Sequence, residues 1–586
     1  MKKQSISTRS YLLLAIPVLL LLASSQGQDS LKQIQDDYWR HQLNESISLR
    51  MKYGLPIEKL PDPSYEGQEK EAAFARSILD RLLKLDAQGL SHQEWISYEI
   101  LKWTTTNTVE WPQHFYLASP VTPYASVIPD VHQLFQRYRF QEVKDLDHYL
   151  AVLRQYPALI GKLHEVLIEQ FRRGLLLPKE ELSQVLAFFQ AYQKPAAESF
   201  FLVNPHRLGG LPVAEVRAFQ EAARVVIDSR INPSLKKLTD YLDGEYKRNA
   251  PDAVGLGNYP GGKEAYRFLV RYHTTMDVTP EEVHQVGLDQ VARINGEMQR
   301  IRESLTFQGT KADFHRFLKT DPQFYPKTSE EIGEKLMAYI RRIEPKIDAY
   351  FLRKPRAPYG VKRLDPVLEG SMTFGYYQDP TSLDPMGIYY YNGSNLNERH
   401  LFPAASLIYH ELVPGHHFQI CLQSENKELP QFRRDELSTA FVEGWAEYAS
   451  GLAGEMGMYQ DPYEQYGRLA AEMFLTCRLV VDTGMNYIGW SRTRAADFMK
   501  DNTLLSETEI FTETLRYSSD IPGQAVAYKM GSMRIKELRE NARETLKERF
   551  DIRLFHDAVL SGGAMPMGVL EKHIDWFVKE QEAKLR

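Results

Sequence analysis

The chain has 586 residues, of which 43% are hydrophobic and 25% charged, and its net charge is −6 at pH 7. Such a mild acidic excess, without a basic cluster, excludes a nucleic-acid-binding protein. A chain of this length ordinarily forms several domains, but the pattern of its apolar residues favours one large helical unit.

The N-terminal segment has the features of a secretory signal peptide. Three basic residues precede an apolar run over 11–23, and small residues over 23–25 offer a cleavage site. The run is shorter than a typical membrane span, and no cysteine stands there to take a lipid. We therefore predict removal of residues 1–25, a periplasmic or secreted location, and no stable membrane insertion of the mature chain. An uncleaved anchor is the alternative.

Long helical periodicities follow, in which apolar residues recur every three or four positions. They cover residues 146–171, 179–193, 213–243, 280–305 and 329–352, and helical patterns dominate again from Ala404 to the C-terminus. Proline and glycine interrupt them around 204–212 and 250–262. The expected fold is mainly α, with one domain over 26–586 in two lobes. The first lobe, residues 26–365, is expected to cover a cleft. The second lobe, residues 366–586, is expected to carry the candidate site.

One short segment predicts a strand. Residues 387–392 read Gly-Ile-Tyr-Tyr-Tyr-Asn, between Asp384-Pro385 and a following glycine. Aromatic and β-branched residues between turn residues are typical of strands. We expect an edge strand of a small β-sheet beside the helical region that starts at Ala404, with an edge that an extended peptide can join as a further strand. A plain core hairpin is the alternative.

The run His-Glu-Leu-Val-Pro-Gly-His-His over 410–417 supplies groups that a zinc hydrolase needs. Catalytic zinc takes three protein ligands and keeps a position open for water, and a carboxylate that is not a ligand accepts the proton from that water. We assign His410 as a ligand and Glu411 as this general base. In the common H-E-x-x-H motif the second histidine follows four residues after the first, whereas here His416 follows after six.

Pro414 and Gly415 offer a solution to this spacing. Proline cannot donate a backbone N–H, and glycine adopts conformations that other residues avoid. We therefore expect a bulged helix that brings His416 onto the metal as the second ligand. His417 is the second choice for this position. On a regular helix one ion would then have to bind two histidines that lie two turns apart. Its other expected role is that of a donor to substrate or to a ligand.

Glu443 and Glu447, in the string Glu-Gly-Trp-Ala-Glu-Tyr over 443–448, stand four residues apart. This spacing places both carboxylates on one helix face. Apolar neighbours surround them, and a buried carboxylate needs a partner. We predict that Glu443 is the third metal ligand and that Glu447 orients a ligand histidine through its free ring N–H. The reverse assignment is the alternative.

Amide hydrolysis also creates an oxyanion, which a side-chain donor stabilises beside the metal. Tyr528 is the candidate donor, and Arg516 and Tyr517 are the alternatives. Because the chain has 33 tyrosines, most of them must be structural. A core tyrosine is therefore the competing interpretation of Tyr528.

These motifs together resemble a large bacterial family known as domain of unknown function number 885. The resemblance rests on the segments 410–417, 443–448, 478–484 and 522–528. That family is similar to mostly helical zinc peptidases such as thimet-type oligopeptidases, angiotensin-converting enzyme and Taq-type carboxypeptidase, so the resemblance implies a two-lobed helical zinc-peptidase-like fold. It spans nearly the whole mature chain.

Two comparisons refine this resemblance. The string at 443–448 is similar to the Asn-Glu-Gly-Phe-Ala-x-Tyr string of zinc aminopeptidases, whose first glutamate binds zinc, and this favours Glu443 as the ligand. One departure is Asn486, which stands where the family often has a histidine. If that histidine contacts substrate in the relatives, the departure affects substrate preference more than the core chemistry.

We therefore expect a secreted zinc peptidase, with one zinc ion per chain, that hydrolyses small peptides through a metal-activated water. A non-catalytic peptide- or metal-binding relative is one alternative, and an amidase acting on non-peptide substrates is the other. Glu411 favours the enzyme, since binding needs only the ligands. Endopeptidase and exopeptidase action are not separated by fold and zinc chemistry. The sequence also leaves open the oligomeric state and whether Cys421 and Cys477 pair.

Overall fold

The structure is a computed structural model that describes residues 30–584, except 125, 370–373 and 383. The predicted signal peptide over residues 1–25 lies outside the described residues. Within these ranges no helix has both the length and the apolarity needed to cross a membrane. Cys421 and Cys477 are both buried and free.

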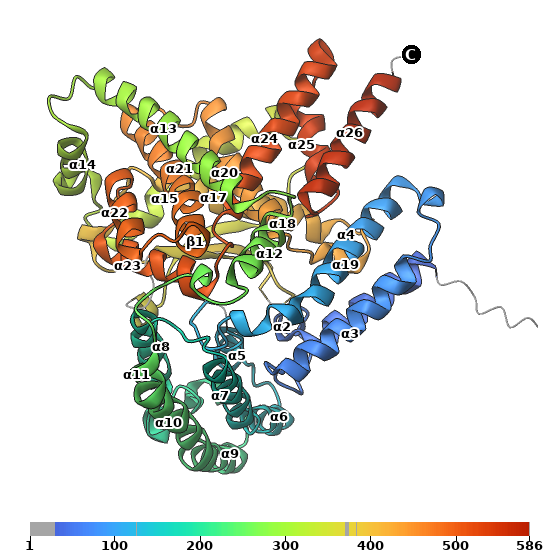
Figure 1. Ribbon diagram of the computed structural model, residues 1–586, viewed down its shortest axis with the longest axis vertical. Helices are drawn as coiled ribbons and strands as arrows, with labels where there is room; N and C mark the ends of the chain where they lie inside the picture. The colour runs from blue at the N-terminus through green and yellow to red at the C-terminus, as the bar shows by residue number, and fades with distance from the viewer. Residues whose placement is uncertain (1–29, 125, 370–373, 383, 585–586) are drawn as a thin grey trace, which may run out of the picture.

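The described residues of the first half of the chain form helices and no strand. Its helices are α1 (Leu31–Glu45), α2 (Ile47–Lys52), α3 (Tyr65–Leu82), α4 (His92–Glu110), α5 (Ile128–Arg137), α6 (Val143–Leu153), α7 (Tyr156–Arg172), α8 (Lys179–Tyr192), α9 (Val213–Val226), α10 (Asn232–Tyr241), α11 (Lys247–Asn249), α12 (Gly262–Thr274) and α13 (Pro280–Ser304). Figure 1 shows α5 to α11 gathered at one end of the molecule. Their buried apolar side chains form a hydrophobic cluster between Ile47 and Ala250.

The second half combines helices with one small sheet. Its helices are α14 (Lys311–Thr320), α15 (Ser329–Ile343), α16 (Pro366–Glu369), α17 (Ala404–Glu411), α18 (His416–Glu425), α19 (Gln431–Arg434), α20 (Thr439–Glu455), α21 (Pro462–Thr483), α22 (Arg492–Asn502), α23 (Glu507–Leu515), α24 (Ala527–Leu546), α25 (Ile552–Ser561) and α26 (Met567–Ala583). Their main hydrophobic cluster also takes in side chains of α1, α3 and α4. The fold is mainly α, as predicted, whereas the lobe boundary at residue 365 stays a prediction.

The helical periodicities are confirmed, with adjusted ends. The pattern at 179–193 is α8, and that at 280–305 is α13. The pattern at 146–171 divides into α6 and α7, and Pro157 occupies the first turn of α7. Proline is well suited to the first turn of a helix, where its missing N–H has no partner to lose. A new helix therefore starts where periodicity alone suggested a continuous one.

The sheet has three strands, β1 (Tyr359–Arg363), β2 (Gly375–Gln378) and β3 (Gly387–Tyr391), in the order β1-β3-β2. Strand β3 pairs in parallel with β1 and antiparallel with β2. The prediction that this segment is an edge strand is therefore wrong. Both of its edges already carry backbone hydrogen bonds, so β3 cannot accept a substrate strand. Its nearly continuous burial fits this central position.

Helices α20 and α24 touch backbone to backbone. A Cβ atom added to Gly444 of α20 would lie 2.6 Å from the carbonyl carbon of Gly531 in α24. One added to Gly531 would overlap the carbonyl oxygen of Ala440. Two glycines thus allow this close approach. It brings the first turn of α24 beside the part of α20 that carries Glu443.

We predict that Gly531→Ala lowers the free energy of unfolding by roughly 1–3 kcal/mol, because the added methyl group forces α20 and α24 apart. Chemical denaturation would measure the change. The matched control is Gly296→Ala in α13, where an added Cβ would meet nothing within 4 Å. There the better helix propensity of alanine should stabilise by about 1 kcal/mol. Equal stability of Gly531→Ala and the wild type would contradict the backbone contact.

Candidate metal centre

The chain breaks sharply between α17 and α18. A Cβ atom on Gly415 would overlap the carbonyl oxygen of His410, so glycine alone allows the backbone to pass this close. The fully buried Trp445 donates its Nε1–H to the carbonyl oxygen of Pro414 at 2.9 Å and fixes the turn from α20. The prediction of a bulge inside one helix is therefore corrected to two separate helices. Proline cannot supply the hydrogen bond that a continuous helix needs there.

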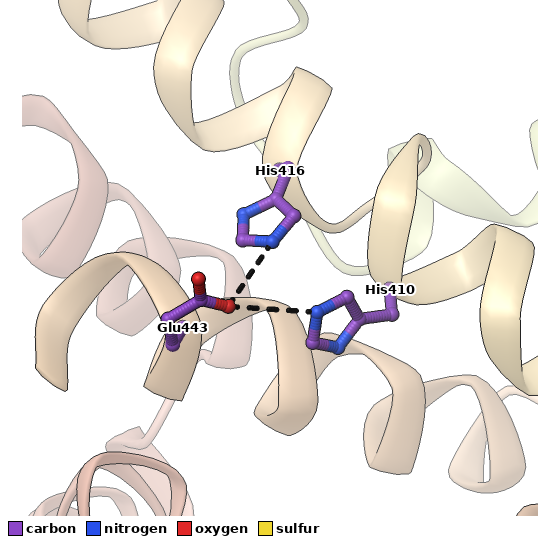
Figure 2. Close-up of side chains that lie close together, drawn as sticks. All are labelled: His410, His416 and Glu443. Carbon is purple, nitrogen blue, oxygen red and sulfur yellow. Dashed lines mark ion pairs between the residues drawn. The ribbon is translucent and has the colours of Figure 1, made fainter. Parts of the chain in front are cut away.

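His410, His416 and Glu443 face one another from α17, α18 and α20, as Figure 2 shows. The Nε2 atoms of His416 and His410 lie 3.3 Å and 3.7 Å from the same carboxylate oxygen, Oε2 of Glu443. Potential ligand atoms of the three residues all lie within 4.8 Å of one another. In the part of the chain that the structure describes, no other three histidine, cysteine or acidic side chains converge in this way.

This donor set fits a zinc ion. Two imidazole nitrogens and one carboxylate oxygen are ligands that catalytic zinc sites use. Among the described residues, neither Oε2 of Glu443 nor the buried Nδ1 of His416 has a hydrogen-bond partner. Because an unpartnered buried carboxylate oxygen costs free energy, a cation held by the cluster would satisfy it.

The charges of the cluster also favour a cation. Burial acts to raise the pKa of Glu443, but His416 and His410 together hold it well below its usual range. Burial acts to lower the pKa of His416, and Glu443 more than offsets this, so that the pKa of His416 is raised. The carboxylate is thus kept ionised and stabilises positive charge between the two rings. A metal cation would compete with protons for this position.

Glu411, the last residue of α17, stands beside the cluster without belonging to it. Burial raises the pKa of its carboxyl group, and Glu443 adds to the rise, while His410 and His416 act against it. Burial and the charge of Glu411 also raise the pKa of Tyr389 in β3. The cluster and the sheet are therefore both within electrostatic range of this carboxyl group. Such a raised pKa suits a group that takes up a proton and then releases it.

His417 lies away from the cluster. Its Nε2–H donates to the carbonyl oxygen of Ala357 at 3.1 Å, and Nδ1 lies 3.0 Å from the hydroxyl group of Tyr377 in β2. The side chain is fully buried, and burial lowers its pKa to about 4. The alternatives that made His417 a ligand or a donor to substrate are therefore corrected. Both ring nitrogens are engaged in fixing α18 against the segments around the sheet.

Glu447 also differs from its expected role. It is buried, and it accepts a hydrogen bond at 2.6 Å from Arg468 of α21 instead of binding a ligand histidine. Arg468 lies 3.8 Å from Glu472, which in turn pairs with Lys529 of α24 at 2.6 Å. One turn along α20, the chain thus meets an ion-pair network that connects three helices.

Tyr528 does reach the cluster. Its ring stacks on that of His410 with centroids 6.4 Å apart and an interplanar angle of 11°. Burial and the charge of Glu443 raise the pKa of its hydroxyl group, whereas Arg516 and Arg478 act to lower it. The hydroxyl group therefore lies within the electrostatic influence of both the metal ligands and two arginines.

Of the two alternatives to Tyr528, only Arg516 retains free hydrogen-bonding capacity. Tyr517 is fully buried, and its hydroxyl group accepts from Nε of Arg478 at 2.7 Å and donates to Glu513. It is therefore a structural residue, which corrects its expected role at substrate. Nη2 of Arg516 donates to Gln524 at 3.0 Å.

Arg478 and Asn486, within and just after the 478–484 segment, make contacts that the sequence did not reveal. Arg478 lies with its Cζ 4.8 Å from the ring centre of Tyr528; its place in a family motif was the available signal. Asn486 is fully buried and accepts from the backbone N–H of Leu256 at 3.0 Å. It also donates to the carbonyl oxygen of Asp482 at 3.0 Å. Asn486 therefore connects its own helical turn to the segment around Leu256, which is far away in the sequence.

We predict that the protein binds about one zinc ion per chain and that His410→Ala, His416→Ala and Glu443→Ala each lose it, because each removes one of three ligands. Elemental analysis after dialysis would measure the zinc content. The matched control is His417→Ala, which removes a neighbouring histidine and should keep zinc. Metal loss only in His417→Ala, or full occupancy in the other three variants, would show that the ligand set is wrong.

Comparisons with known proteins agree with this helical architecture. The model of a family described as "Bacterial protein of unknown function (DUF885)" matches residues 49–574. A solved candidate lipoprotein from Colwellia psychrerythraea is 26% identical, with a TM-score of 0.87 over 94% of this chain and 100% of that one. A candidate lipoprotein of unknown function from Shewanella oneidensis is 19% identical, with a TM-score of 0.71 over 93% and 99%. The chain thus belongs to the bacterial family DUF885.

Proposed function

We propose that this protein is a zinc-dependent peptidase. The observation that supports it is the convergence of His410, His416 and Glu443, with the partly buried carboxyl group of Glu411 beside them and outside the ligand set. Metal binding alone requires only the ligands. Hydrolysis also requires a general base, and a neighbouring carboxyl group with a raised pKa suits that role.

Each residue of the site then has a distinct task. Zinc held by the three ligands would polarise a carbonyl group and lower the pKa of water. Glu411 accepts the proton that water loses and passes it to the amine that leaves. Tyr528 donates its hydroxyl hydrogen to the substrate oxygen on which negative charge develops. Atoms balance in this sequence, since one water is divided between the new carboxyl group and the released amine.

We further propose that the protein acts outside the cytoplasm. Residues 1–25 have the sequence features of a signal peptide. Both solved relatives are described as candidate lipoproteins. An exported peptidase of this kind would meet peptides in the cell envelope or the surroundings of the cell.

The direct test is incubation of a mixed peptide library with zinc-loaded protein, followed by mass spectrometry of the products. We expect new peptide termini that do not form after zinc is removed by a chelator and that return when zinc is restored. A library that stays intact with fully zinc-loaded protein would contradict peptidase activity.

We predict that Glu411→Gln lowers kcat by at least about 10²-fold, because the amide cannot accept the proton. Zinc content and thermal stability should stay near those of the wild type. The matched control is Glu425→Gln on α18, whose carboxylate accepts a hydrogen bond at 3.0 Å from Nε of Arg356. It should keep normal turnover. Near-normal hydrolysis by zinc-loaded Glu411→Gln would exclude Glu411 as the base.

We predict that Tyr528→Phe lowers kcat by roughly 10²- to 10³-fold, as expected when one donor to an oxyanion is removed. The ring that stacks on His410 remains, so zinc content should not change. Steady-state kinetics would separate the effects, since the loss belongs mainly in kcat and much less in KM. A variant with unchanged kcat would make Tyr528 a purely structural residue.

A further inference from the structure

We propose that Arg478 and Arg516 form a subsite that binds a carboxylate group of the substrate, and that this carboxylate is the C-terminal one of a peptide. The inference rests on the proposed peptidase function and names its substrate class. The protein would then cleave its substrate at a fixed distance from the C-terminal end of the peptide.

The two arginines lie next to the metal cluster. The ring of Tyr528 stacks on His410 at 6.4 Å, and Cζ of Arg478 lies 4.8 Å from the ring of Tyr528. Arg516 lies beside Arg478, since its Nη1 is 3.6 Å from the carboxylate of Glu513, to which Arg478 also binds. An extended peptide advances about 3.3 Å per residue. A carboxylate bound by the arginines would therefore lie about one to three residues from the bond at the metal.

The arginines are not balanced by an equal number of partner carboxylates. Their side chains are only 6% and 14% exposed, and among the described residues they share a single ion-pair partner, Glu513. Nη2 of Arg478 lies 3.2 Å and Nη1 of Arg516 3.6 Å from its carboxylate. Two guanidinium groups therefore share one direct carboxylate partner, and a buried charge without its own counter-ion is costly.

The charge of Arg516 acts to lower the pKa of two other acidic residues, Asp482 and Asp520, without an ion pair to either among the described residues. Burial raises the pKa of Asp482 to about 7 and that of Asp520 to about 6. The carboxyl group of Asp482 accepts hydrogen bonds from the hydroxyl group of Tyr266 and the backbone N–H of Gly523. Neither acid forms an ion pair with Arg516 in the part of the chain that is described. At neutral pH both carboxyl groups carry part of a negative charge, which offsets some of the charge of Arg516, but neither one occupies a donor of its guanidinium group.

Arg516 also retains an unused donor. Its Nε atom is buried and has no hydrogen-bond partner among the residues that the structure places. A guanidinium group binds a carboxylate through two parallel N–H···O bonds, a geometry that lysine cannot reproduce. Nε of Arg478 donates to the hydroxyl group of Tyr517, and its Nη2 donates to Glu513. We therefore assign the direct contact mainly to Arg516, with Arg478 supplying charge beside it.

A substrate carboxylate has two sources, the C-terminus of a peptide and an acidic side chain. We favour the C-terminus because the subsite lies at a short, fixed separation from the metal, and every small peptide ends in a carboxylate whatever its sequence. The test uses three otherwise identical hexapeptides. One ends in a free acid, one in a C-terminal amide, and one in a C-terminal amide with glutamate as its last residue.

Binding of each peptide to zinc-loaded Glu411→Gln would be measured by calorimetry, and hydrolysis by the wild type would be followed separately. We expect the free acid to bind about 10- to 100-fold tighter than the neutral amide, the range for one charge-assisted hydrogen-bonded contact. Adding Arg516→Gln should abolish this difference, and Arg516→Lys should keep part of it. Arg492→Gln is the matched control, since this partly buried arginine pairs with Glu180 and should leave the preference intact.

Equal binding of acid and amide, with both hydrolysed, would overturn the carboxylate subsite and leave the peptidase standing. A preference for the free acid that depends on Arg516, without any hydrolysis by the wild type, would support the subsite and reject the peptidase. Tighter binding of only the glutamate peptide would overturn the assignment to the C-terminus. Equal loss of all three peptides in both Arg516 variants would show a structural role and overturn the proposal.

Discussion

The metal cluster depends on one backbone contact, that between Gly415 and the carbonyl group of His410. Any side chain at Gly415 would overlap that oxygen, so glycine alone lets the chain turn sharply enough to bring His416 opposite Glu443. Trp445 fixes the turn from α20 through its hydrogen bond to the carbonyl group just before that glycine. The separation of the two histidines is therefore set by a backbone turn and not by the face of one helix.

Helix α20 connects this turn to the rest of the site. Successive residues point in directions about 100° apart, so neighbouring positions serve different partners. Glu443 faces the two histidines, and Gly444 lies against the backbone of α24. Glu447 binds Arg468 of α21. A shift of α20 would disturb the cluster, the contact with α24 and the ion-pair network together, so the ligand geometry is coupled to the packing of the whole helical core.

The amino-acid sequence predicted the helices and grouped His410, His416 and Glu443, because residue type and local spacing contain that information. It did not predict the order of the strands, since β3 pairs with β1, which begins nearly thirty residues earlier. The partner of Glu447 could not be predicted either, because Arg468 belongs to another helix and only packing decides which charges meet. Periodicity shows which residues share a helix face, but it does not show where a helix ends, so a break was mistaken for a bulge.

The site has two regions with charged groups of opposite sign, and each region favours a ligand of the opposite charge. Around Glu443, an ionised carboxylate with an oxygen that makes no hydrogen bond to a described residue favours a cation. Around Arg478 and Arg516, two guanidinium groups that share one direct carboxylate partner among the described residues favour an anion. Tyr528 lies between them. Glu443 acts to raise the pKa of its hydroxyl group, and the two arginines act to lower it. A peptide whose carbonyl group approaches a metal while its carboxylate meets the arginines would satisfy both regions at once. Because each region is buried, the electrostatic gain from such a ligand is larger than it would be in water, and selectivity for it follows from the same burial.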